Sequence, residues 1–135
     1  MTGIQEPAEV ECTVVDVLDD GSVVISVQGR RERVRLHGLD VPVPVPPGYV
    51  EILTQRLARV ARPLRVETTA PGPPPRVILW YLAWQDKSGP VWDDVATALL
   101  AEGAARVALP HDREDYLRAE ADARTRGVGI WSDRS

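Results

Sequence analysis

The sequence predicts an α+β fold in which a five-stranded barrel is accompanied by three helices. Two observations carry this prediction. Hydrophobic periodicity gives the order three strands, one helix, two strands and two helices, and glycines and prolines separate most of these segments. The chain of 135 residues also has the usual size of one domain, and we expect it to span residues 1–135 with a core at about 9–133.

The first three strands are predicted to form an antiparallel meander. Val10–Val17 places apolar side chains at alternate positions, and Ser22–Val27 is rich in β-branched residues. Arg31–Leu36 alternates strictly, because one face carries three arginines and the other carries Glu32, Val34 and Leu36. Asp19–Gly21 and the Gln28-Gly29 pair contain the residues that favour tight turns, so they are predicted to connect the strands.

A stiff connector and a helix are predicted to follow the meander. Val41–Gly48 reads VPVPVPPG, and its prolines exclude it from a sheet interior because each lacks a backbone donor. Apolar residues then recur at helical spacing, which predicts an amphipathic helix that ends at Pro63. They are Tyr49, Ile52, Leu53, Leu57 and Val60.

Two further strands, Leu64–Thr68 and Val77–Trp84, are predicted on either side of a proline-rich turn at Pro71–Pro75. Trp80 is expected in the core, whereas Trp84 and Trp92 are expected to be partly exposed. With five strands, closure into a barrel of the oligonucleotide-binding type is the predicted way to remove open sheet edges.

Two helices are predicted at the C-terminal end. Asp93 or Asp94 is a suitable N-cap for a helix that passes through Leu100, and Gly103 can close it in the left-handed conformation. Asp112 is predicted to cap a second helix, Arg113–Arg126, which Gly127 closes.

The charges are segregated along the chain. The formal net charge is -4, which disfavours broad electrostatic affinity for nucleic acid. However, Met1–Asp20 carries only acidic charges, whereas Arg30, Arg31, Arg33 and Arg35 cluster within six positions. A local basic patch is therefore predicted on an acidic chain.

Composition also indicates where the protein resides. No apolar run approaches the length that crosses a bilayer, so no membrane partner is expected. The acidic N-terminus lacks the features of a secretory signal, which favours a cytoplasmic location. Cys12 is the only cysteine, and it is predicted to be a buried thiol.

Three strings in this order resemble the staphylococcal nuclease, or thermonuclease-like, family. RVRLHGLDVP, Arg33–Pro42, resembles the family's third strand and its exit. LLAEGAARV, Leu99–Val107, resembles a helix with its glycine cap, and the stretch from Tyr116 through AEADARTRGVGIWSD resembles the last helix and its tryptophan-containing close. The resemblance covers most of the chain and implies the same five-stranded barrel with three helices.

The family cuts DNA and RNA with calcium, so the resemblance implies a site of two aspartates, a glutamate and two arginines. Asp40 matches a metal ligand, and Arg35 matches the first phosphate-binding arginine. Arg76, at the start of the fifth strand, is the candidate for the second arginine. Carboxylates suit a hard cation and an attacking water, and guanidinium groups suit the charge on phosphate.

The sequence departs from the family pattern at the carboxylates. The family's Asp-Gly-Asp-Thr turn is replaced by Asp19-Asp20-Gly21-Ser22, so Gly21 occupies the place of the second metal ligand and Asp20 lies one position away. Val41 replaces a threonine, and Val43 replaces the glutamate that serves as general base. The resemblance therefore implies an impaired active site, with Asp40 and Asp20 as candidate metal ligands.

Structural alternatives stand beside these assignments. Asp40 can cap its turn or pair with Arg35, Asp19 and Asp20 are common turn residues, and Arg76 can be an exposed residue at a strand start. Whether the chain is an enzyme stays open at this point.

The leading hypothesis is a catalytically impaired domain that binds single-stranded nucleic acid or another phosphate-bearing ligand through Arg31, Arg33 and Arg35. One alternative is an active calcium-dependent nuclease, with calcium as its cofactor. The other is a protein-interaction module, because a preformed polyproline segment such as VPVPVPP is a familiar recognition surface.

Overall fold

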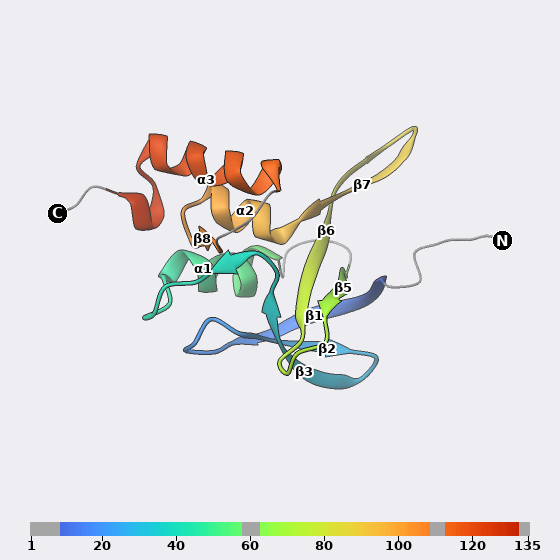
Figure 1. Cartoon of the computed structure of the whole chain (residues 1–135). Helices are drawn as coiled ribbons and strands as arrows, with labels where there is room; N and C mark the ends of the chain where they lie inside the picture. Colours follow the sequence, from blue (N-terminus) through green and yellow to red (C-terminus); the bar gives the residue numbers. More distant parts are fainter. Residues whose placement is uncertain (1–8, 58–62, 109–112, 133–135) are drawn as a thin grey trace.

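A five-stranded closed barrel forms the body of the molecule, as predicted (Figure 1). The computed structural model describes residues 9–57, 63–108 and 113–132. The barrel strands run in the order β3-β2-β1-β5-β6, and β6 pairs with β3 to close the circle. Their bounds are Glu9–Val17 for β1, Val23–Val27 for β2, Arg30–Leu36 for β3, Leu64–Ala70 for β5 and Arg76–Asp86 for β6.

Closure depends on a short parallel pairing between β3 and β6. Arg35 lies opposite Arg76 and Leu36 lies opposite Val77, whereas the other barrel pairs are antiparallel. The Arg35 amide also donates to the Pro75 carbonyl at 2.9 Å, which extends the contact beyond the strand. This seam joins the first and last of the five barrel strands, as the barrel prediction requires.

The strand alternation fills the barrel with apolar side chains. Because neighbouring residues of a strand point to opposite faces, one parity of each strand enters the interior. The members of this interior set are Cys12, Val23, Ile25, Val34, Leu36, Leu64, Val66, Val77 and Leu79, and all are buried. Burial raises the pKa of the Cys12 thiol to about 12, so it stays a neutral core group, as predicted.

Three strands were not predicted from the sequence. β7, Gly89–Asp94, pairs with β6 and makes a hairpin that stands away from the barrel (Figure 1). β4, Leu39–Asp40, pairs with β8, Arg106–Val107. Two-residue strands carry no periodicity, and the Gly-Pro pair at the start of β7 is uncommon in strands, so neither kind of segment gives a clear local signal.

Trp80 departs from its predicted place in the core. Its side chain is half-buried, and its indole nitrogen donates to Glu67 at 3.2 Å. Trp80 belongs to the outward-facing parity of β6, since Val77 and Leu79 occupy the interior. The expectations for Trp84, which is exposed, and for Trp92, which is half-buried, are confirmed.

The predicted helix after the proline connector begins earlier and has two parts. α1, Pro47–Glu51, continues without a break into a π-helical turn, Ile52–Arg56. The predicted last turn, at Val60, lies outside the described residues. Tyr49, Ile52 and Leu53 face the core, as their spacing predicts.

The two C-terminal helices are confirmed. α2, Val95–Ala101, is capped by Asp94, whose carboxylate accepts a hydrogen bond from the Ala96 amide at 2.8 Å. α3, Glu114–Arg126, ends at Gly127 in the left-handed conformation, with φ of 66°. The predicted cap Asp112 lies outside the described residues. Among the described helices, none has the length and apolar character needed to span a membrane.

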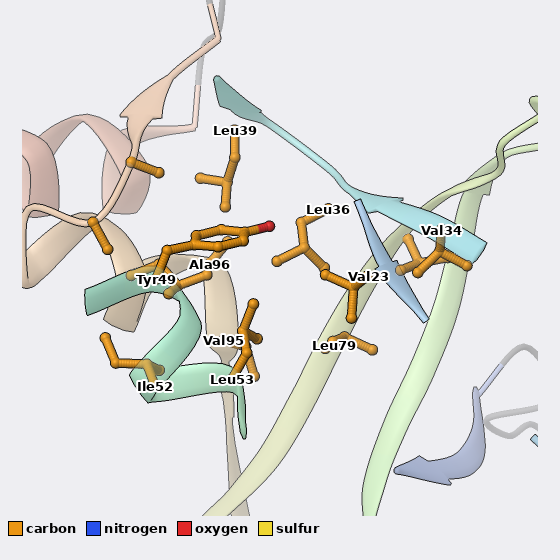
Figure 2. Close-up of a cluster of buried hydrophobic side chains, with 14 of the residues drawn as sticks. Val23, Val34, Leu36, Leu39, Tyr49, Ile52, Leu53, Leu79, Val95 and Ala96 are labelled. Carbon is orange, nitrogen blue, oxygen red and sulfur yellow. The ribbon is translucent and has the colours of Figure 1, made fainter. Parts of the chain in front are cut away.

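A single cluster of buried side chains joins the barrel to the helices (Figure 2). Figure 2 shows Tyr49 of α1 pointing toward Leu36 at the end of β3, with Val95 and Ala96 of α2 beside it. Full burial of one large apolar side chain contributes roughly 1.5–3 kcal/mol. This core therefore fixes α1 and α2 against the end of the barrel where β3 meets β6.

Candidate phosphate-binding site

A pocket of about 380 Å³ opens where β3 and β6 close the barrel. It brings together three of the predicted site residues, Arg35, Arg76 and Asp40. The described residues that line it are Gly21, Arg35, Leu36, Leu39, Asp40, Val41, Arg76 and Ala108. Asp20, Arg31, Arg33 and Val43 do not belong to it.

The parallel register places two arginines side by side. Arg35 and Arg76 are direct partners in the β3–β6 pairing, so both side chains emerge at the rim of the same pocket. Arg76 is exposed and makes no ion pair with any part of the chain that the structure describes. Two neighbouring guanidinium groups repel each other, and an anion between them would relieve that repulsion.

Asp20 holds the first of these arginines in place. Its Oδ2 atom accepts from the Arg35 guanidinium at 3.1 Å and also from Arg33. Its Oδ1 atom accepts from the Ser22 hydroxyl at 2.6 Å and from the Ser22 amide at 2.9 Å. These donors, the Ser22 hydroxyl foremost, hold the pKa of the Asp20 carboxyl well below its usual range.

The expected pair between Arg35 and Asp40 is not formed. Arg35 pairs with Asp20, and the Asp40 carboxylate lies 3.4 Å from Arg106. The β4–β8 pairing explains this choice, because it places Asp40 directly opposite Arg106. Asp40 thus lines the pocket with its charge already partly balanced.

The position that resembles the second metal ligand is closed to a side chain. Gly21 has a φ of +89°, and a Cβ atom there would lie 2.9 Å from the Val41 Cβ. The Gly21 carbonyl accepts a hydrogen bond from the buried Tyr49 hydroxyl at 2.6 Å, which fixes the turn. A carboxylate at this position would require both the turn and Val41 to move.

The donor set does not fit the calcium ion that the resemblance implies. Calcium takes six to eight oxygen ligands, usually from several carboxylates. The Asp20 carboxylate is already bonded to Ser22 and two arginines, and Asp40 is the single carboxylate among the described lining residues. Residues 9–57, 63–108 and 113–132 contain no group of three or more His, Cys, Asp or Glu that could hold a metal ion.

Among the described residues that line the pocket, Asp40 is the one carboxylate that could replace the missing general base, and it is paired with Arg106. Val43 is 70% exposed on the proline connector and does not line the pocket. Asp20 is a poor substitute, because a carboxylate with a strongly lowered pKa has little tendency to take a proton from water. The described lining of the pocket therefore offers two arginines but one carboxylate, which is already paired with Arg106.

The remaining predicted arginines extend from the pocket along β3. Arg31, Arg33 and Arg35 occupy alternate positions of the strand, so they lie on one face of it. Arg31 is exposed, whereas Arg33 is paired with Asp20. The row forms a basic track that ends at Arg35.

Leu39 and Ala108 line the pocket, and sequence reasoning missed both. They reach it through the small β4–β8 sheet, which the Ala108 amide extends by donating to the Gly38 carbonyl at 2.8 Å. An isolated leucine and alanine carry no local signal of such a role. The sequence indicated this side of the pocket only through Asp40, at the exit of the third strand.

No protein-family model matches the chain, and no curated protein matches it. The function must therefore be argued from the pocket and from the residues that build it.

Proposed function

We propose that this chain is a divergent member of the staphylococcal nuclease family that binds single-stranded nucleic acid with little or no cleavage. The observation that carries the proposal is the placement of Arg35 and Arg76 as direct partners at the rim of one pocket. The carboxylates that cleavage needs are replaced there by Gly21 and, on the connector, by Val43.

The two arginines suit a phosphate group in different ways. Arg35 is held by Asp20 on one side, so little side-chain freedom is lost when it meets a ligand. Arg76 is free to turn toward the ligand. A guanidinium offers paired N–H donors that match two phosphate oxygens, which makes arginine well suited to this task.

The basic track on β3 supports a ligand with more than one phosphate. Positions two residues apart on a strand advance by about 6.6 Å. That step is comparable with the separation of successive phosphates in an extended single strand. Arg31 and Arg35 can therefore meet different phosphates of one chain, with Arg33 between them held by Asp20.

Cleavage is disfavoured on two independent grounds. Loss of a positioned general base alone lowers turnover by roughly 10²- to 10⁴-fold. The poor fit of the carboxylates to calcium removes the charge that would polarise the phosphate. A nuclease of this family would need both groups, so binding is the activity that the pocket supports.

Titration of a labelled single-stranded oligonucleotide, followed by fluorescence anisotropy at low and moderate salt, tests the binding. Arg76→Ala is expected to weaken affinity several-fold at low salt and to lower the logarithmic salt slope by about 0.7, the share of one phosphate contact. The variant should keep its stability, because Arg76 forms no ion pair with the described residues.

Arg118→Ala is the matched control. It removes the same charge from α3, where Arg118 is exposed and lies 3.7 Å from Glu114. The affinity of this variant for the oligonucleotide should stay close to that of the unmodified chain. If the unmodified chain fails to bind at low salt, the nucleic-acid proposal is wrong, and the protein-interaction module becomes the better account.

A further inference from the structure

The Arg35 guanidinium is tied to a turn that precedes β2. It donates to two atoms of Asp20, the backbone carbonyl at 3.4 Å and the carboxylate Oδ2 at 3.1 Å. Asp20 belongs to the turn at residues 18–22, whose ends are joined by a hydrogen bond from the Leu18 amide to the Ser22 carbonyl at 2.9 Å. Because both contacts of Arg35 end on this turn, the position of the turn decides where the guanidinium lies at the pocket rim.

Tyr49 holds the same turn from the core side. Its hydroxyl donates to the Gly21 carbonyl at 2.6 Å, and the tyrosine side chain is fully buried. Figure 2 shows the hydroxyl oxygen, in red, directed from α1 toward Leu36, the residue that follows Arg35. The Gly21 carbonyl is the next one along the backbone after the Asp20 carbonyl that accepts from Arg35. One hydrogen bond from the helix therefore fixes the part of the turn that holds Arg35.

The turn has Tyr49 on one side and Val41 on the other. Gly21 and Val41 both line the arginine pocket, and a Cβ atom at Gly21 would lie 2.9 Å from the Val41 Cβ. Tyr49 does not belong to the lining, so it can act on a ligand only through the turn. Burial raises the pKa of the Tyr49 hydroxyl, the charge of Arg35 lowers it, and the charge of Asp20 raises it, so the hydroxyl stays a neutral donor close to both charges.

We infer that Tyr49 is a positioning residue for anion binding, because its hydroxyl holds the Gly21 turn that orients Arg35 at the pocket rim. The inference rests on the proposed function, in which Arg35 meets a phosphate. Arg35 is ordered before the ligand arrives, whereas Arg76 forms no ion pair with the described residues. Ordering a long side chain during binding lowers affinity, so loss of the Tyr49 hydrogen bond weakens a phosphate that Tyr49 does not touch.

NMR relaxation of the arginine Nε–H groups in the free protein tests the positioning directly. The Arg35 signal, assigned from its loss in Arg35→Ala, should be more ordered than the Arg76 signal in the unmodified chain. Tyr49→Phe removes a single oxygen atom and keeps the ring in the core. It should make the Arg35 group more mobile on the picosecond to nanosecond timescale and leave the Arg76 group unchanged.

Tyr116→Phe is the matched control. Tyr116 is also fully buried, and its hydroxyl also donates to one acceptor, the Asp94 carboxylate. It lies on α3 and does not line the arginine pocket. Both variants should lose stability, because each leaves a buried acceptor without its donor. Only Tyr49→Phe should mobilise Arg35, whereas a purely structural role for Tyr49 predicts the same result for the two variants.

The oligonucleotide titration separates positioning from contact. Tyr49→Phe should weaken affinity by about twofold to tenfold, the range expected when one long side chain must be ordered on binding. Its logarithmic salt slope should stay unchanged, because Arg35 still reaches the phosphate, whereas Arg35→Ala should lower the slope by about 0.7. The effect of Tyr49→Phe should be smaller in Asp20→Asn, which has already lost the closer contact to Arg35.

The inference is overturned if Tyr49→Phe leaves Arg35 as ordered as in the unmodified chain, or mobilises it without weakening the oligonucleotide. Equal effects of Tyr49→Phe and Tyr116→Phe on Arg35 would also overturn it. Asp20→Asn leaves the core intact and should itself mobilise Arg35, so an ordered Arg35 in that variant contradicts the inference as well. If the unmodified chain binds no oligonucleotide, the proposed function fails, and the Arg35 relaxation alone decides whether Tyr49 positions this arginine.

Discussion

Asp20 shows how one residue changes the chemistry of the pocket. Its carboxylate accepts hydrogen bonds from Ser22, Arg33 and Arg35, and these contacts use both oxygen atoms. A metal ion at the same carboxylate would have to displace two positive side chains. Asp20 is therefore better suited to orienting arginines for an anion than to binding a cation.

The lowered pKa of Asp20 predicts a pH-dependent share of stability. When a carboxyl has a lower pKa in the folded state, its contribution is full above its ordinary pKa of 3.8 and is lost as pH falls below that value. The free energy of unfolding should therefore fall less steeply with decreasing pH in Asp20→Asn than in the unmodified chain. Urea unfolding at a series of pH values below neutrality measures this.

The neighbouring Asp19 provides the control. It is exposed in the same turn, and the structure gives it no hydrogen bond or ion pair among the described residues. Asp19→Asn should keep the acid dependence of the unmodified chain. If both variants behave alike, Asp20 does not hold the arginines in solution as it does in the structure.

At the level of elements, the start of α2 is the point at which the two C-terminal helices are joined. Asp94 is buried, caps α2 through the Ala96 amide, accepts from the Tyr116 hydroxyl of α3, and lies 3.4 Å from Arg113. Burial raises the pKa of Asp94, because the charge is held away from water. The two helices thus depend on one carboxyl group.

Asp94→Ala should lower the free energy of unfolding by about 2–4 kcal/mol. It removes an N-cap and leaves the buried Tyr116 hydroxyl without its acceptor. Asp93→Ala, one residue earlier and exposed, should change stability by no more than about 0.5 kcal/mol. Chemical unfolding followed by circular dichroism compares them, and equal losses would contradict the assigned cap.

Most of the elements could be predicted because their signals are local. Alternation gives β2 and β3, proline marks the connector, and glycine ends α2 and α3. β4 and β8 could not be predicted, because two residues become strands only when the chain brings them together. The outward position of Trp80 likewise depends on how β6 lies in the closed barrel.

The candidate site was predicted in part. The resemblance named Arg35, Arg76 and Asp40, and one pocket contains all three. The ion pairs were predicted wrongly, since Arg35 contacts Asp20 and Asp40 contacts Arg106. Pairings between residues far apart in sequence leave no periodic trace, so only the fold reveals them.

For the whole molecule, local charge matters more than the net charge of -4. The closure of the barrel collects arginines at one pocket, whereas the hairpin and helices collect aspartates and aromatic rings at another. On our proposal, the domain binds a negatively charged ligand without relying on catalysis.

The most direct test of the central claim incubates the labelled oligonucleotide with the protein in millimolar calcium or in chelator. Affinity is measured first, and strand length is then read on a denaturing gel. We expect equal binding in both solutions and strands of unchanged length, because the described lining of the pocket has two arginines but one carboxylate, which is paired with Arg106 and does not make a set of metal ligands. Calcium-dependent shortening that is lost in Asp40→Ala would contradict the account.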